Sequence, residues 1–147
     1  MQMLAHGIQS VKNGGPFVQK FYTSNQTKMS YVDMKDYAEA AAEIIAAGTY
    51  MYGTYELCSE GAYSLADIEN IFSELTGRKV TSAFIGDADF LATTHKASDS
   101  YAGQTLLTMF RHYNENSFCG NAFTLTQILG RHPVTIREYL KKELQSE

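Results

Sequence analysis

The sequence predicts an α/β domain: a small, mostly parallel sheet of about three strands, flanking helices and a helical C-terminal third. Between residues 28 and 85, short β-prone runs alternate with segments of helical periodicity, an order typical of parallel pairing. Beyond residue 99, the periodic segments are helical. The chain of 147 residues fits one domain spanning 1–147.

The N-terminal part predicts a helix, a strand and a second helix. The first helix covers residues 1–11 and ends at Gly14-Gly15-Pro16. A short strand over 28–32 follows. Asp33 then begins a helix that runs to residue 46, since its carboxylate can accept from free amides of the first turn. This helix is rich in alanine and has few charges, which predicts burial on more than one side.

The middle of the chain predicts two further strands, over 53–58 and 79–85, with a helix between them. Ser64 and Asp67 have the spacing of a capping box, in which hydroxyl and carboxylate satisfy free backbone amides reciprocally. The apolar residues of 65–75 recur at helical spacing and form one stripe.

The last third predicts helices over 99–114 and 124–129, and a final helix that begins near Pro133. A second capping box, Thr135 with Glu138, supports that start. Asp87 and Asp89 share a loop before this region. We expect them to be solvated or to cap a helix, with an acid–base pair as the alternative.

Composition excludes several function classes. The 44% of apolar residues suffices for a core, and the net charge of -4 gives no reason to expect a nucleic-acid or anionic-membrane partner. We find neither an apolar run of about 20 residues, the length that spans a bilayer, nor a signal peptide. Cys58 and Cys119 are therefore expected to be reduced thiols in a cytoplasmic protein.

Motifs for phosphate and metal binding are missing from the sequence. It contains neither Gly-x-Gly-x-x-Gly nor a P-loop. Tyr31 and Lys35 form a Tyr-x-x-x-Lys pair, but Tyr31 falls on a predicted strand, so we interpret the match as coincidence. No metal site is expected, because none of the histidines has a partner at ligand spacing; they are His6, His95, His112 and His132.

Aromatic and methionine side chains are the best candidates for a ligand site. They could line an apolar pocket for a small organic molecule, with an ordinary core as the competing interpretation. From this set and its neighbourhood we select four candidate substrate-binding residues: Phe17, Met29, Tyr31 and Phe118. The full set is Met1, Met3, Phe17, Met29, Met109, Phe110, Tyr113 and Phe118.

Several short motifs follow one another in a familiar order from residue 28 to the end. They are Ser30-Tyr31-Val32-Asp33, Asp36–Ala41, Gly53–Leu57, Tyr63–Ile68, Leu75–Val80 and Leu129–Thr135. Together they resemble the C-terminal half of an NmrA-like protein, in the atypical short-chain dehydrogenase/reductase superfamily. Asp33 and Asp36 within these motifs are explained as caps of the helix that they precede or begin.

The resemblance implies a two-part fold, in which a Rossmann domain binds NAD(P)H and a smaller C-terminal part closes over a substrate cleft. Members include reductases of quinones, aromatic ethers or related small molecules, and regulators that sense NADP without turnover. The family's glycine motif and catalytic region would precede residue 1, so none of its nucleotide-binding or catalytic residues maps onto this sequence. We therefore expect a partial, Rossmann-like and truncated domain that is inactive alone and binds no cofactor, with NADP or NAD implied only for full-length relatives.

Two functions from different classes remain open. The first is the substrate-binding portion of an NAD(P)H-dependent oxidoreductase acting on a small organic molecule. The second is a non-enzymatic NmrA-like module for regulation or protein interaction. A third reading, an unrelated small-molecule-binding α/β domain, would be favoured by antiparallel strands. Because an open sheet leaves edges and an apolar face uncovered, we also expect a homo-oligomer.

Overall fold

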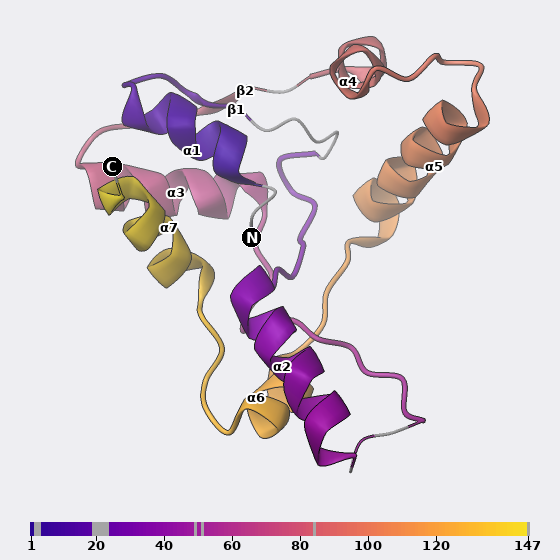
Figure 1. The fold of residues 1–147 in the computed structure, drawn as a ribbon. Coiled ribbons are helices and arrows are strands. Elements are labelled where there is room, and N and C mark those ends of the chain that lie inside the picture. Colours follow the sequence, from indigo (N-terminus) through magenta and orange to yellow (C-terminus); the bar gives the residue numbers. More distant parts are fainter. Residues whose placement is uncertain (2–3, 19–23, 49, 51, 84, 147) are drawn as a thin grey trace. The chain divides into compact units, whose positions relative to one another are not determined.

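The computed structural model of the chain describes residues 1, 4–18, 24–48, 50, 52–83 and 85–146 (Figure 1). The chain divides into two compact units. Each unit is assembled from segments that lie far apart in the sequence, so no single cut would separate the two. The single domain expected from the length is not tested by this division and stays a prediction. The first unit comprises Met1–Met3, Met29–Ala62 and Cys119–Glu147, and the second Leu4–Lys28 and Tyr63–Phe118.

The first unit contains the helices α2 (Met34–Ala47), α6 (Phe123–Leu129) and α7 (Ile136–Gln145). Figure 1 shows α6 beside α2, and the two helices share an apolar core. Ala40 of α2 and Leu125 and Ile128 of α6 are its buried residues. The small side chain of Ala40 allows the two helices to approach closely.

The caps of α2 explain its boundaries. The carboxylate of Asp33 accepts a hydrogen bond from the backbone N–H of Lys35 (3.2 Å), as predicted. The helix ends at Gly48, whose φ of 63° lies in the left-handed region that glycine enters without steric cost. The prediction that α2 is buried on more than one side is wrong, since its buried residues, Asp36 and Ala40, lie on one face.

α7 begins at the second predicted capping box. The hydroxyl of Thr135 accepts from the N–H of Glu138 (3.2 Å), and the Glu138 carboxylate accepts from the Thr135 N–H (2.9 Å). Tyr139 lies on the buried face of the helix. Burial raises the pKa of its phenol to about 12, and the carboxylates of Glu143 and Asp33 act in the same direction.

The second unit contains α1 (Ala5–Lys12), β1 (Phe17–Val18), α3 (Leu65–Thr76), β2 (Ser82–Ala83), α4 (Asp87–Thr94) and α5 (Tyr101–Asn116). β1 and β2 pair in parallel, with Phe17 opposite Ser82 and Val18 opposite Ala83. α1 contacts β1, and α3 contacts β2. The ring of Phe17 packs on Phe72 of α3 at a centroid distance of 5.0 Å, which joins the paired strands to that helix.

The predicted three-strand sheet is not confirmed. In the described part of the chain, strand pairing of more than one residue is confined to β1 and β2, and β1 was not predicted. Among the described residues, Tyr31 O in the predicted strand 28–32 accepts one backbone hydrogen bond, from the N–H of Ser59, which lies just beyond the predicted strand 53–58 (2.7 Å). A ladder requires this bond to repeat along both segments, so one bond leaves them irregular. Of the predicted strand over 79–85, β2 occupies Ser82 and Ala83.

The observed helices agree with the sequence prediction better than the strands do. α1, α2, α3, α5, α6 and α7 lie where capping residues and apolar periodicity predicted them, within a few residues at each end. α4 was missed, because its N-cap is Gly86, which has no side chain to accept from the first turn. Asp87 and Asp89, predicted in a loop, lie instead in the first turn of this helix.

Ser64→Ala should lower the free energy of unfolding by about 1 kcal/mol, because α3 then loses its reciprocal cap. In the native chain the Ser64 hydroxyl accepts from Asp67 N–H (3.2 Å), and the Asp67 carboxylate accepts from Ser64 N–H (2.9 Å). Urea denaturation measures the change, with the exposed Ser98→Ala as the matched control. Equal losses in both variants would contradict the cap.

Stability should fall as the pH rises from 10 to 12, in part through Tyr139. The phenol in the unfolded chain, with its ordinary pKa near 10, loses its proton before the folded one does, so alkali favours unfolding. Tyr139→Phe should flatten this part of the stability curve, measured by urea denaturation at successive pH values. Tyr101→Phe, at an exposed position of α5, serves as the control and should leave the slope unchanged.

Candidate functional site

The four predicted substrate-binding residues fall into both units. Phe17 and Phe118 belong to the second unit, Met29 and Tyr31 to the first. Phe17 is fully buried in its pair with Phe72, the position of a core side chain. Phe118 is 54% exposed and belongs to a separate aromatic group, so the structure does not bring Phe17 and Phe118 together. Tyr31 is buried and Met29 half-buried; their role in binding substrate stays a prediction.

Phe118 is the outermost ring of a row that continues into the core of the second unit. Phe90 contacts Phe110 edge-on (centroids 5.1 Å apart), Phe110 contacts Tyr113 edge-on (5.8 Å), and Tyr113 contacts Phe118 with the rings tilted (5.1 Å). We call these four residues the aromatic row. The two inner rings are buried, Tyr113 is half-buried, and Phe118 is exposed. The exposed ring is thus supported from behind by rings that are fixed in a core.

Local sequence explains how the row is held. Phe110 and Tyr113 lie one turn apart on α5, so their rings meet on one face of the helix. The helix ends at Ser117, whose φ of 60° turns the chain and whose N–H donates to Tyr113 O (2.7 Å). Phe118 is then fastened by its own N–H, which donates to Lys28 O (2.9 Å).

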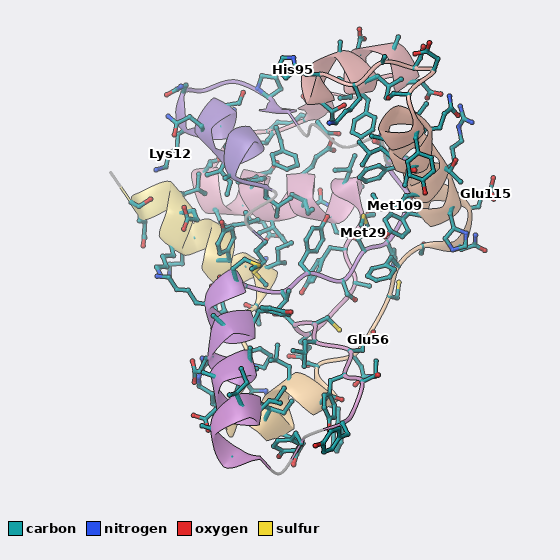
Figure 2. All side chains as sticks on the ribbon, turned by 45° about the vertical axis from the view of Figure 1, so that its right-hand side comes forward. Lys12, Met29, Glu56, His95, Met109 and Glu115 are labelled. Atoms are coloured by element: carbon teal, nitrogen blue, oxygen red, sulfur yellow. The ribbon has the colours of Figure 1, made fainter. Side chains whose placement is uncertain are left out.

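The surroundings of the row suit a flat organic ligand. Met109, labelled on α5 in Figure 2, packs against the same core and is half-buried. Aromatic faces stack on planar rings, and a thioether adapts to irregular apolar shapes. Phe110, Tyr113 and Phe118 belong to the aromatic set predicted from the sequence, whereas Phe90 does not.

The first unit contains a polar junction that sequence reasoning missed. Asp36 is 1% exposed, and Arg131 donates to its Oδ1 (2.8 Å) while the N–H of Val134 donates to its Oδ2 (2.6 Å). Arg131 also contacts Glu39 (2.5 Å). Both hydrogen bonds raise the pKa of the Arg131 guanidinium above its ordinary value, and the bond to Glu39 has the larger effect.

The junction corrects the interpretation of Asp36 as an N-terminal charge that merely suits the helix dipole. Asp33 does cap α2, but Asp36 binds the segment that joins α6 to α7. A buried carboxylate requires a charged or N–H partner, and the motif Leu129–Thr135 contains both partners of Asp36, Arg131 and Val134. Sequence spacing alone could not pair two residues 95 positions apart.

Beside the junction lies a hollow of about 580 Å³. Its charged groups have mixed signs, with Glu60 and Glu138 against Lys142, and Glu138 is held in the cap of α7. The cap bonds to Thr135 also lower the pKa of Glu138. The hollow thus offers no set of like charges that would select an ionic ligand. It is lined by Glu60, His132, Pro133, Val134, Thr135, Glu138 and Lys142.

Two pairs that the sequence offered for catalysis, Tyr31 with Lys35 and Asp87 with Asp89, do not have the geometry of a catalytic pair. Tyr31 precedes α2 and Lys35 lies within it, so the pair does not share a helical face. Asp87 forms an ion pair with Arg111 (2.8 Å), a contact within the second unit that favours a structural role over acid–base chemistry with Asp89.

Cys58 is a buried thiol rather than a reactive one. It donates to Asn121 O (3.1 Å), and burial raises its pKa, with the Glu56 carboxylate acting in the same direction. Glu56 is labelled in Figure 2. The backbone of Gly120 lies against this thiol, since a Cβ there would be 2.6 Å from the Cys58 Sγ. Cys119, next to it, is exposed, and neither cysteine forms a disulfide.

The described residues do not fit the pyrophosphate of a dinucleotide. A phosphate cradle needs a strand, a glycine turn and a helix whose N-terminus faces the anion. β2, Gly86 and α4 have this order, but Asp87 and Asp89 occupy the first turn of α4 and would repel phosphate. The described ranges also contain no cluster of three or more side chains suited to a metal ion.

The chain matches one known protein family over most of its length. The sequence profile of the NmrA-like family matches residues 2–140. Comparison with curated protein sequences gave no significant match. In the described segments, no helix combines the length and the apolar character needed to cross a membrane.

Three solved structures resemble the chain in fold. A nucleoside-diphosphate-sugar epimerase from Staphylococcus aureus is 17% identical, with a TM-score of 0.72 over 94% of this chain and 47% of that one. An NADPH-dependent quinone oxidoreductase from Escherichia coli is 21% identical (TM-score 0.69, 96% and 50% covered). A triphenylmethane reductase from Citrobacter sp. is 18% identical (TM-score 0.69, 95% and 48% covered). The chain spans about half the length of these structures.

Asp36→Ala should destabilise the chain by about 2–3 kcal/mol, because it leaves the N–H of Val134 and the Arg131 guanidinium without their shared acceptor. Urea denaturation measures the loss. The matched control is Glu39→Ala, which removes an exposed carboxylate from the same guanidinium and should cost less than about 0.5 kcal/mol. Similar losses in the two variants would show that burial of Asp36 is unimportant.

Proposed function

Because this chain belongs to the NmrA-like family, we propose that it is the substrate-side portion of an NAD(P)H-dependent oxidoreductase that acts on a small, flat organic molecule. The observation that carries this proposal is the aromatic row, which ends in the exposed ring of Phe118. A ligand ring placed on Phe118 would gain stacking energy and remove apolar surface from water.

The comparisons support an oxidoreductase-related ancestry in general terms. Two of the similar structures are reductases, one named for quinones and the other for triphenylmethane dyes. Both substrate classes are built from conjugated rings. We extend this ligand chemistry to the present chain as part of the proposal, since an exposed aromatic ring with a rigid support suits such molecules.

We further propose that the chain alone binds neither NADPH nor NADH and has no catalytic activity. The triphenylmethane reductase is known in complex with NADP(H). In the present chain, the one described strand–glycine–helix segment has two carboxylates where a phosphate would lie. The nicotinamide would supply the hydride in a complete enzyme, and the residues described here would bind and orient the acceptor ring.

A cytoplasmic location belongs to the same proposal. Neither Cys58 nor Cys119 forms a disulfide, and reduced thiols persist in a reducing compartment.

The second candidate function is a non-enzymatic NmrA-like module for regulation or protein interaction. It is favoured by large apolar side chains exposed on α2, of which Ile45 is the most exposed at 76%. Such side chains in a group are typical of interaction surfaces. A ligand titration distinguishes the two functions, because only the first requires that the aromatic row bind a small molecule.

Calorimetric titration with anthraquinone-2-sulfonate tests the first function. This probe is planar and soluble, and its quinone ring has no free position for addition of the exposed Cys119 thiol. The native chain should bind it, and Phe118→Ala should weaken binding about tenfold, since one stacking contact and its buried area are lost. NADPH added to the mixture should not be consumed.

Phe123→Ala is the matched control for this titration, because Phe123 is an exposed phenylalanine of the first unit, at the start of α6. Its affinity should equal that of the native chain. Equal weakening in both variants would contradict a site at the aromatic row, and failure of the native chain to bind would favour the interaction module.

A further inference from the structure

His112 is an exposed residue of α5 that lies next to the aromatic row. Its ring contacts the ring of Tyr113, with the centroids 6.3 Å apart and the planes tilted by 58°. Phe118 contacts the same Tyr113 ring at a centroid distance of 5.1 Å, so both exposed rings adjoin Tyr113. A flat ligand of two or three fused rings that stacks on Phe118 can therefore bring its edge to the imidazole.

The hydrogen bonds of Asn116 determine which imidazole nitrogen carries the proton. The Asn116 Nδ2 lies 3.1 Å from the backbone oxygen of His112 and 3.2 Å from its Nδ1. Because a carbonyl oxygen can only accept, the amide must present its NH₂ group on this side, with two hydrogens for the two acceptors. Nδ1 of His112 is then an acceptor, and in the neutral ring the single proton lies on Nε2.

The Nε2–H group is a hydrogen-bond donor on the side of the imidazole ring away from the Asn116 contact. Two neighbouring side chains of α5 differ from it in chemistry. Arg111 forms an ion pair with Asp87 (2.8 Å), and Glu115, labelled in Figure 2, has a carboxylate that only accepts when it is ionised. Of the three, His112 combines a ring contact with the aromatic row and a neutral N–H donor.

We propose that His112 is a specificity-determining residue of the ligand site, whose Nε2–H donates to a carbonyl oxygen on the ring of the ligand. This inference rests on the proposed function, since it requires that the aromatic row bind a flat molecule. It narrows the substrate class to planar ring systems with a carbonyl group at their edge, such as quinones. The stacked rings supply most of the affinity, and the imidazole distinguishes a carbonyl-bearing ring from a hydrocarbon ring of the same shape.

Two ligands of matched shape test this hydrogen bond in the full chain. Anthraquinone-2-sulfonate has ring carbonyl groups and anthracene-2-sulfonate has none, while the three fused rings and the sulfonate are common to both. Calorimetric titration of the native chain should show about fivefold tighter binding of the quinone, because one neutral hydrogen bond adds to the stacking. His112→Phe keeps an aromatic ring but has no N–H, so it should bind the two ligands with equal affinity.

A conservative variant and a matched control separate the hydrogen bond from a change in shape. His112→Gln should restore the preference for the quinone, because its side-chain amide also presents an N–H donor. His132→Phe makes the same substitution at an exposed histidine of the first unit and should keep the full preference. Circular dichroism checks that each variant is folded.

Nitrogen NMR of the imidazole tests the position of the proton without any ligand. In alkaline buffer, where imidazole rings are neutral, the native chain should show the proton of His112 on Nε2. Asn116→Ala removes the donor to Nδ1 and should give a mixture of the two tautomers, with a smaller preference for the quinone.

The outcomes distinguish this inference from the proposed function. Equal affinity of the native chain for the two ligands, a preference that persists in His112→Phe, or a proton on Nδ1 would overturn the inference. The proposed function would still stand in each of these cases, provided that both ligands bind and Phe118→Ala weakens them. A native chain that binds neither ligand would contradict the proposed function and, with it, the inference.

Discussion

A buried carboxylate needs partners, and in this chain that need determines the arrangement of the first unit. Asp36 cannot keep its charge away from water unless donors surround it. Arg131 and the N–H of Val134 provide them, and both belong to the segment between α6 and α7. The same contact therefore fixes the direction in which the chain leaves α6, and the place where the cap of α7 begins. The apolar contact of Ala40 with Leu125 and Ile128 holds α2 against α6 in the same arrangement.

The helices were largely predictable because their signals are local. A capping box spans four residues, and hydroxyl and carboxylate at the right spacing act within the same turn, as at Ser64 and Thr135. α4 shows the limit, since a glycine N-cap carries no such signal. Strands depend on a partner supplied from elsewhere in the chain, so β-prone composition at 28–32 and 53–58 indicated extended backbone but not a ladder.

The candidate site was predictable in composition but not in geometry. Phe118 and the methionines were recognisable as apolar side chains suited to a ligand, yet nothing in the sequence separates an exposed Phe118 from a fully buried Phe17. That difference arises from the turn at Ser117 and the backbone bond to Lys28, which join segments far apart in the chain. The same reasoning applies to α2, whose alanine-rich sequence indicated apolar faces without indicating which of them the fold would cover.

The interleaving of the two units has a consequence for synthesis on the ribosome. All residues of the second unit have been translated once residue 118 is reached, whereas the first unit waits for its C-terminal segment. Arg131 follows Asp36 by 95 residues, which corresponds to roughly 5–20 s of elongation at about 5–20 residues per second. During that interval the nascent chain carries Asp36 without Arg131 and α2 without α6. The first unit begins early in the sequence, with the motif Ser30–Asp33, but it is the last unit that the growing chain can complete.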